Sequence, residues 1–196
     1  RVTLGANDFS AIKTTKKKVT KKVAKSVKIA SPKKTAENAG SATETSAAIS
    51  LPDFFIEATS GSKINLKELK GKVVVLYFYP KDKTPGCTLE GRDFSKLHKK
   101  FHNLNAEIFG VSRDTVKMHE SFKSQECFSF ELLSDSDEKL CRHFDVIKPK
   151  NMYGKMVIGI ERSTFVFNKD HVLVKSWRKV KVDGHANEVL KFIESL

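Results

Sequence analysis

Cysteine is scarce in this chain, with three residues among 196 and no regular spacing between them. So few cysteines cannot form a disulfide framework, and a reducing intracellular setting is therefore expected. No two of them form a C-x-x-C pair, which argues against dithiol exchange as the activity. No apolar run approaches the roughly 18 residues that a membrane-spanning helix needs, so no contact with a membrane interior is predicted.

Other signals of function are also missing. The sequence shows no secretory signal and no glycine-rich phosphate loop, and its six histidines form no triad pattern. Cys141 and His143 lack metal-ligand spacing and two further ligands. We therefore expect neither a metal nor an organic cofactor.

Positive charge is abundant but unevenly distributed. Residues 1–50 hold 11 Lys and Arg against three acidic residues, a net charge of +8, whereas residues 51–196 hold 25 against 20, a net charge of +5. Residues 1–48 also contain only one aromatic side chain, Phe9. A segment of this composition buries too little apolar surface to offset the entropy of ordering, so residues 1–48 are predicted to form a disordered Lys-rich tail.

Lysines recur through residues 13–34 of this tail. The simplest interpretation is a solvated extension, and the alternative is contact with DNA or RNA, which would weaken steeply as salt rises. A basic run of this kind also predicts a nuclear location. A cytoplasmic location, or import into a plastid or mitochondrion through a transit peptide poor in acidic residues, stays open.

Residues 49–196 have the pattern of one folded domain. Strands are predicted at 54–56, 64–66, 73–79, 108–111, 132–133, 164–167 and 172–174. Helices are predicted at 66–69 (one turn), from Cys87 through Phe101, from a cap at Asp114 through Phe122, at 138–144, and from a cap at Asp183 through Ile193. Alternating strands and helices followed by a hairpin predict an α/β fold, a central mixed sheet flanked by helices, which resembles the thioredoxin fold.

The most informative segment is the apolar run 73–79 followed by a turn that ends at Cys87. A buried strand that delivers a cysteine to the first turn of a helix places its sulfur near unpaired backbone N–H groups and the positive end of the helix dipole. This setting favours the thiolate, which is the reactive form.

Residues 79–90 resemble the active-site segment of peroxiredoxins of the PrxQ type, also called bacterioferritin comigratory proteins. Pro80, Thr84 and Cys87 meet the general signature P-x-x-x-[ST]-x-x-C. A second family segment, G-I-x-R-x-[ST]-F, is matched by residues 159–165, which include Arg162. The resemblance covers about residues 50–196.

This resemblance implies a thiol-dependent peroxidase that reduces hydrogen peroxide and organic hydroperoxides. Cys87 would attack the peroxide and become a sulfenic acid, beside the permanent charge and N–H donors of Arg162. Thr84 would hold the peroxide in line, and Pro80 would shield the sulfur. Taken singly, these residues have simpler roles, as a strand terminator, a turn, a surface charge or a small buried side chain.

The chain departs from the family pattern at Arg92, where many PrxQ-type proteins carry a resolving cysteine. Cys127 and Cys141 are the remaining possible partners, and either could reach Cys87 only after local unfolding. We therefore expect a one-cysteine cycle in which thioredoxin, glutaredoxin or glutathione reduces Cys87. A monomer or weak dimer is expected. The rival hypothesis is a nucleic-acid-associated redox protein anchored by its tail.

Overall fold

The structure is a computed structural model that describes residues 49–152 and 154–196. The predictions of a disordered tail over residues 1–48, of DNA or RNA contact through residues 13–34, and of a targeting signal all lie outside the described residues.

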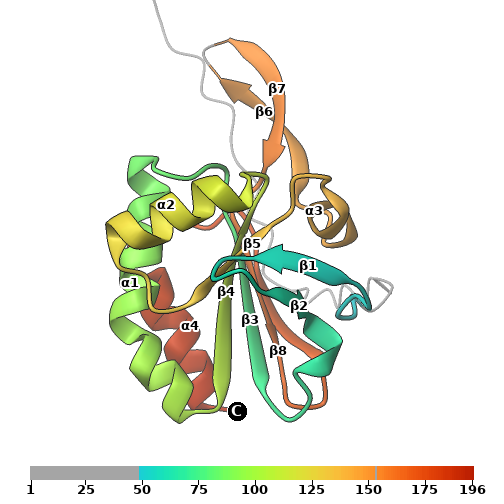
Figure 1. Cartoon of the computed structure of the whole chain (residues 1–196), viewed down its shortest axis with the longest axis vertical. Helices are drawn as coiled ribbons and strands as arrows, with labels where there is room; N and C mark the ends of the chain where they lie inside the picture. Colours follow the sequence, from blue (N-terminus) through green and yellow to red (C-terminus); the bar gives the residue numbers. More distant parts are fainter. Residues whose placement is uncertain (1–48, 153) are drawn as a thin grey trace, which may run out of the picture. The chain divides into compact units, whose positions relative to one another are not determined.

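A mixed sheet of seven strands forms the centre of the domain, in the order β2-β1-β5-β4-β3-β8-β9 (Figure 1). In chain order the elements are β1 (Phe55–Ala58), β2 (Lys63–Asn65), η1 (Leu66–Glu68), β3 (Val73–Phe78), α1 (Pro85–Asn103), β4 (Ala106–Ser112), α2 (Val116–Glu126), β5 (Glu131–Ser134), α3 (Lys139–His143), β6 (Ile147–Met152), β7 (Lys155–Ile160), β8 (Ser163–Phe167), β9 (Leu173–Trp177) and α4 (His185–Glu194). The pairs β3–β4 and β4–β5 are parallel, whereas β8 and β9 add antiparallel strands at one side and β1 and β2 at the other. The predicted α/β class with a mixed central sheet is confirmed.

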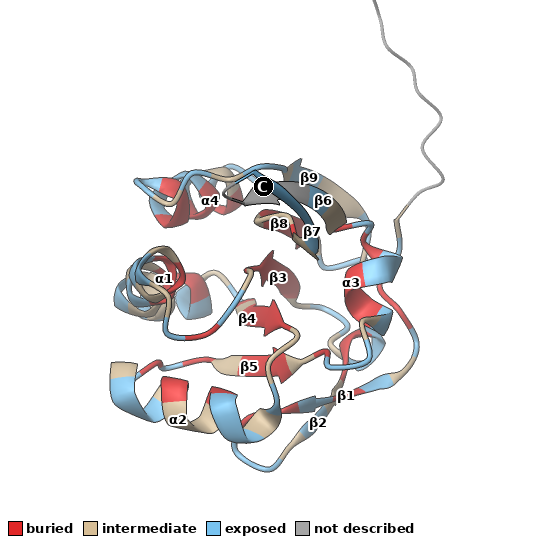
Figure 2. Ribbon diagram, turned by 90° about the horizontal axis from the view of Figure 1, so that it is seen from above, coloured by how far each residue is buried: buried red, intermediate tan, exposed pale blue. Residues whose placement is uncertain are grey.

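Strand β3 explains why the sheet is covered on both faces. All six of its residues are buried, and alternate side chains enter two different cores. Val73, Val75 and Tyr77 face α1, α2 and α4, whereas Val74, Leu76 and Phe78 face α3 and the N-terminal elements. Figures 1 and 2 show the same division, with three helices on one side of the buried central strands and α3 on the other.

Two predicted helix caps are wrong. Helix α2 is capped by Thr115, whose side chain accepts a hydrogen bond from the backbone N–H of Met118, and not by Asp114. The Asp114 carboxylate instead accepts bonds from Ser112 Oγ and from the backbone N–H of Asp82. Helix α4 begins after Gly184, at a φ of 72°, so Asp183 is not its cap either. In both cases the neighbouring residue takes the cap position.

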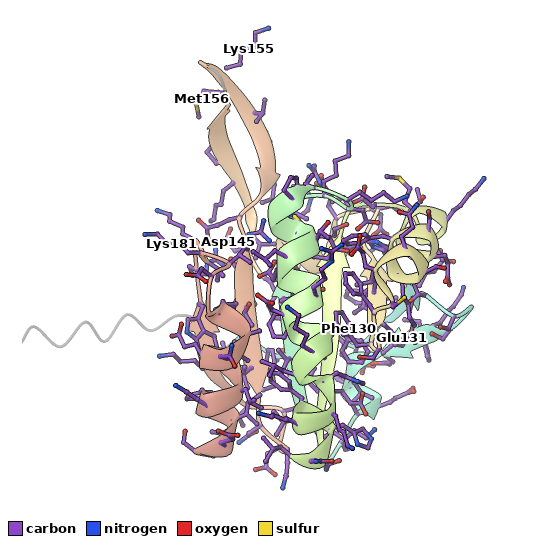
Figure 3. All side chains as sticks on the ribbon, turned by 90° about the vertical axis from the view of Figure 1, so that its left-hand side faces the viewer. Phe130, Glu131, Asp145, Lys155, Met156 and Lys181 are labelled. Carbon is purple, nitrogen blue, oxygen red and sulfur yellow. The ribbon has the colours of Figure 1, made fainter. Side chains whose placement is uncertain are left out.

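The pair β6–β7 was not predicted from the sequence. These strands form a separate two-stranded ribbon that projects from the sheet, with Lys155 and Met156 at its outer end (Figure 3). Several β7 side chains are exposed, including Ile158 at 69%. Because this ribbon packs against little else, its pattern lacks the half-buried alternation that identifies a strand.

Among the described residues, no helix has the length and apolar character needed to cross a bilayer.

Candidate active site

Cys87 lies in the first turn of α1, as the sequence pattern predicts. Thr84 is the N-cap with extended backbone, and Pro85 begins the helix, a position where proline is well tolerated. The strand β3 ends at Phe78, so only a short loop separates the buried sheet from the helix N-terminus. Cys87 is only 2% exposed and belongs to the core on the side of α1, α2 and α4.

Arg162 reaches this sulfur from another part of the chain. It lies between β7 and β8, and the antiparallel register of β8 with β3 places Ser163 opposite Phe78. Arg162 is therefore next to the point where β3 leads into the cysteine loop. Its Nη2 lies 3.3 Å from Cys87 Sγ, so a permanent cation stands within hydrogen-bond distance of the sulfur.

Glu90 completes this cluster. One of its carboxylate oxygens accepts a hydrogen bond from Nη1 of Arg162, and its side chain is 1% exposed. Within the described part of the chain, the other oxygen, Oε1, has no hydrogen-bond partner. The guanidinium thus uses one nitrogen on the carboxylate and another on the sulfur, which fixes its orientation.

The electrostatic balance of this cluster follows from burial. Burial raises the pKa of Glu90 to about 7, and the charge and hydrogen bond of Arg162 offset part of that rise. Burial alone would lower the pKa of Arg162, but Glu90 and Cys87 outweigh it and hold that pKa above its usual value. Arg162 therefore stays charged beside the sulfur at any physiological pH.

Glu90 was not identified from the sequence, although a signal exists. Five residues follow one another at intervals of three and four, which places them on one face of a helix. They are Cys87, Glu90, Phe94, Leu97 and Phe101. A lone acidic residue within such an apolar stripe must be buried, and a buried carboxylate requires a cation. Only the fold shows that this cation is Arg162.

Thr84 and Pro80 lie in the predicted loop but do not contact the sulfur through a hydrogen bond that the structure records. The Thr84 hydroxyl donates to the carbonyl oxygen of Lys81 at 3.0 Å, and the side chain makes no cap bond. Pro80 directly follows the buried Tyr79 and is itself half-buried. The structure therefore brings Cys87 and Arg162 together, with Thr84 and Pro80 in the adjoining loop.

A buried histidine lies behind the site. The Nε2 atom of His185, in α4, is 2.8 Å from Oγ1 of Thr164 in β8. Burial lowers the pKa of His185 to about 4, and the charge of Arg162 acts in the same direction, whereas Glu188 opposes it. A neutral imidazole is therefore expected here at physiological pH.

The other two cysteines differ sharply in position. Cys141 is fully buried in the second core, on the opposite face of the sheet from Cys87. Cys127 is exposed and ends α2 in a left-handed conformation, with φ of 54°. It lies beside α1, because the preceding Glu126 is 2.5 Å from Arg92 Nε. Within the described residues, no cluster of His, Cys, Asp and Glu is placed to hold a metal ion.

The sequence matches one known family and several known proteins. Residues 49–176 match the AhpC/TSA family. The Peroxiredoxin Bcp of Xanthomonas campestris pv. campestris is 50% identical over 155 residues, covering 77% of this chain and 97% of the relative. The Peroxiredoxin Bcp of Bacillus subtilis is 46% identical over 145 residues, covering 74% of this chain and 92% of the relative.

Solved structures show the same likeness. A structure of Xanthomonas campestris Peroxiredoxin Q is 50% identical, has a TM-score of 0.71, and covers 76% of this chain and 97% of that chain. Another, of the Xanthomonas campestris bacterioferritin comigratory protein, was described in connection with its alkyl peroxide reduction activity and also has a TM-score of 0.71, at 50% identity over 76% of this chain and 98% of that chain.

Proposed function

The chain belongs to the AhpC/TSA family, as a peroxiredoxin of the PrxQ or Bcp type, and we propose that its thiol peroxidase reaction takes place on Cys87. The observation that carries this assignment is the 3.3 Å contact between Arg162 Nη2 and the Cys87 sulfur at a helix N-terminus. A guanidinium and a helix N-terminus each stabilise a negative charge placed beside them, and the thiolate is the form of cysteine that attacks peroxide.

The proposed step is a displacement at oxygen. The Cys87 thiolate forms an S–O bond with one peroxide oxygen while the O–O bond breaks, and the other oxygen leaves as hydroxide or alkoxide and takes up a proton. The sulfur is oxidised to sulfenic acid and the peroxide is reduced to water or an alcohol. Arg162 would stabilise the negative charge that develops on the departing oxygen.

The substrates proposed are hydrogen peroxide and small organic hydroperoxides. Support for the organic class comes from the Xanthomonas campestris relative, whose structure was described together with alkyl peroxide reduction. Thr84 is the N-cap of α1 and Pro80 lies in the loop before it, so we propose that Thr84 orients the peroxide and Pro80 limits access of water.

Recycling is proposed to use an external thiol. A disulfide between Cys87 and Cys141 would have to pass through the sheet, since the two residues occupy its opposite cores. Cys127 is at the surface near Arg92, at the end of a different helix, so it could reach a buried sulfur only if α1 or α2 unwound. We therefore propose that thioredoxin, glutaredoxin or glutathione reduces the sulfenic acid, and that the protein acts as a monomer or weak dimer.

Intact-mass analysis after one equivalent of peroxide tests this proposal. The expected product is the parent mass plus one oxygen, trapped by a sulfenic-acid reagent at Cys87, and Cys127→Ser should behave in the same way. Cys87→Ser should gain no trapped adduct. A parent mass reduced by two hydrogens, and lost in Cys127→Ser, would instead identify Cys127 as a resolving cysteine and contradict the one-cysteine cycle.

Nucleic-acid contact and a nuclear location are retained as proposals from the basic composition of residues 13–34 alone. They describe where the peroxidase would act and do not alter its chemistry.

A further inference from the structure

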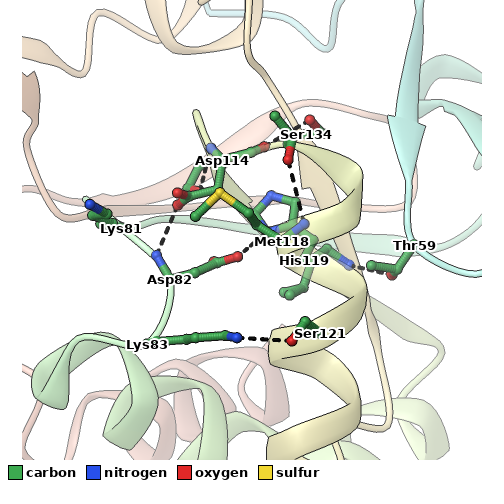
Figure 4. Close-up of polar contacts among 12 residues, drawn as sticks. Thr59, Lys81, Asp82, Lys83, Asp114, Met118, His119, Ser121 and Ser134 are labelled. Carbon is green, nitrogen blue, oxygen red and sulfur yellow. Dashed lines mark hydrogen bonds and ion pairs between the residues drawn. The ribbon is translucent and has the colours of Figure 1, made fainter.

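The loop between β3 and α1 contains a carboxylate that the peroxidase step does not use. The side chain of Asp82 is fully buried, and a buried carboxylate is costly unless it is paired and hydrogen-bonded. Oδ1 accepts a hydrogen bond from the Tyr79 hydroxyl at 2.7 Å, and Oδ2 lies 2.8 Å from Nδ1 of His119 in α2. Figure 4 shows Asp82 in the loop facing His119.

The contacts of His119 show how it holds Asp82. The ring is fully buried, with Nδ1 at the Asp82 carboxylate and Nε2 3.2 Å from the backbone oxygen of Leu133. A carboxylate oxygen accepts hydrogen bonds, so an N–H at Nδ1 is the group that pairs with Asp82. The Tyr79 hydroxyl, 3.4 Å from Nδ1, directs its proton to Asp82 at the shorter distance. Asp82 and His119 therefore form a buried hydrogen-bonded pair.

The surrounding groups bring no lysine or arginine to the Asp82 carboxylate. Asp114, from the β4–α2 connection, accepts from the backbone N–H of Asp82 at 2.8 Å. Lys83 points to the surface instead, where its Nζ is 2.8 Å from Ser121 Oγ. Among the described residues, His119 is thus the basic partner recorded for the Asp82 carboxylate.

The Asp82–His119 pair connects three elements to the cysteine loop. Tyr79 directly follows β3, His119 belongs to α2, and the Leu133 carbonyl belongs to β5. Two residues after Asp82 the loop reaches Thr84, the N-cap of α1. Lys83, between them, has a φ of 60°, a conformation that persists in a non-glycine residue when its surroundings hold it.

We propose that His119 is a positioning residue of the peroxidase reaction, acting through its contact with Asp82 on the loop that presents Thr84 and the Cys87 turn to the peroxide. The proposal rests on the proposed role of Cys87. Reaction rates depend steeply on such placement, because a shift of about 1 Å can cost about 100-fold. His119 itself touches neither sulfur nor peroxide, so its effect is geometric.

Two substitutions separate positioning from general stability. An asparagine amide nitrogen reaches the place of Nδ1, and a glutamine amide nitrogen that of Nε2. Both remove the ring and one of its two polar contacts, but only His119→Asn keeps the donor to Asp82. We expect His119→Gln to slow the second-order oxidation of Cys87 by about 10-fold or more, and His119→Asn to stay within about 3-fold of the parent.

The measurement is stopped-flow oxidation of the fully reduced full chain by hydrogen peroxide, with circular dichroism and thermal melting as checks on folding. His102→Gln, at an exposed residue of α1, is the matched control and should react like the parent. Equal slowing of His119→Gln and His119→Asn, or no slowing of His119→Gln, would overturn the proposal, because a merely structural role does not distinguish the two nitrogens.

A milder variant covers the case in which His119→Gln does not fold. Tyr79→Phe removes one hydrogen bond to Asp82 and leaves the contact with His119, so it should slow Cys87 oxidation by about 3-fold, and an unchanged rate would overturn the proposal. The two proposals fail differently. If the parent chain forms no sulfenic acid at Cys87, the proposed function is wrong; if it does and these variants match it, only the positioning role is wrong.

Discussion

Cys87 and Cys141 are buried on opposite faces of one sheet, to 2% and 0% exposure, yet their surroundings differ in charge. Cys87 has the Arg162 guanidinium 3.3 Å from its sulfur. Burial raises the pKa of Cys141 far above its usual value, and the negative charge of Asp135 raises it further. Removal from water is thus common to both, and the sign of the nearest charge separates a reactive sulfur from an inert one.

The two faces also differ in what they do for the fold. On the Cys141 face, both oxygens of Asp135 accept from backbone N–H groups at the start of α3, those of Leu140 and Cys141. That carboxylate stabilises a helix N-terminus. On the Cys87 face, the buried carboxylate of Glu90 is directed to a side-chain cation that also contacts sulfur. Similar polar groups therefore serve structure on one face and chemistry on the other.

The largest expected difference between the faces is in activity. Cys87→Ala should lower peroxide turnover by at least about 1,000-fold, since it removes the nucleophile. Cys141→Ala should leave turnover within about 2-fold and cost about 1 kcal/mol of stability, the effect of a small cavity. Peroxide consumption with an excess of dithiol, and chemical unfolding, measure the two effects. Comparable losses of turnover in both variants would remove the contrast.

The next largest effect concerns Arg162. Arg162→Met should slow Cys87 oxidation by about 100- to 1,000-fold, because the charge that favours the thiolate and the developing oxyanion is lost. Arg162→Lys should recover only part of this rate, since an ammonium ion cannot hold Glu90 and Cys87 with fixed donors. Stopped-flow oxidation measures the rate for each variant, and the thiolate absorbance of the reduced protein measures how much of Cys87 is in the reactive form.

A control is needed because Arg162→Met leaves the Glu90 carboxylate buried without its cation, which alone could destabilise the fold by about 3–5 kcal/mol. The double variant Glu90→Gln with Arg162→Met removes both charges. It should regain stability and remain slow. If the double variant also regained the rate, the guanidinium would have a structural role and not a catalytic one.

Local patterns account for the parts of this molecule that could be predicted. The apolar run 73–79, the turn and the helix that follow it identify β3, α1 and the place of Cys87 without tertiary information. Arg162 was identified by a family motif, and the structure now places it beside the sulfur. Its position depends on the antiparallel pairing of β8 with β3, which no local pattern encodes.

The features that were missed are tertiary pairings. The Asp82–His119 contact joins residues 37 positions apart, and neither residue stands out in its polar stretch of sequence. The opposite-face location of Cys141 likewise depends on which core receives α3. The caps at Thr115 and Gly184 differ from the expected residues by one position, which is the usual uncertainty of a helix boundary.

The smallest expected effect tests whether the buried carboxylate of Glu90, on the Cys87 face of the sheet, lowers the free energy of unfolding when it is ionised. The pKa of Glu90 is raised from 4.5 to about 7 in the folded protein. A raised folded pKa contributes stability that is fully present below pH 4.5 and is lost as the pH rises through about 7. The free energy of unfolding should therefore fall by about 2–3 kcal/mol over that interval because of this group alone.

Glu90→Gln isolates that contribution, because other groups, including His185 with its pKa of about 4, titrate in both chains and cancel in the difference. Urea unfolding of the reduced parent and variant at pH 5 and pH 8 should give curves that converge or cross, with the parent losing about 2–3 kcal/mol relative to the variant. Parallel curves would mean that Glu90 is ionised throughout, held so by Arg162. The Arg162 guanidinium would then be paired with an ionised Glu90 as well as with the Cys87 sulfur at every pH. The contrast between Cys87 and Cys141 would in that case depend on how the guanidinium is oriented toward the sulfur more than on the net charge nearby.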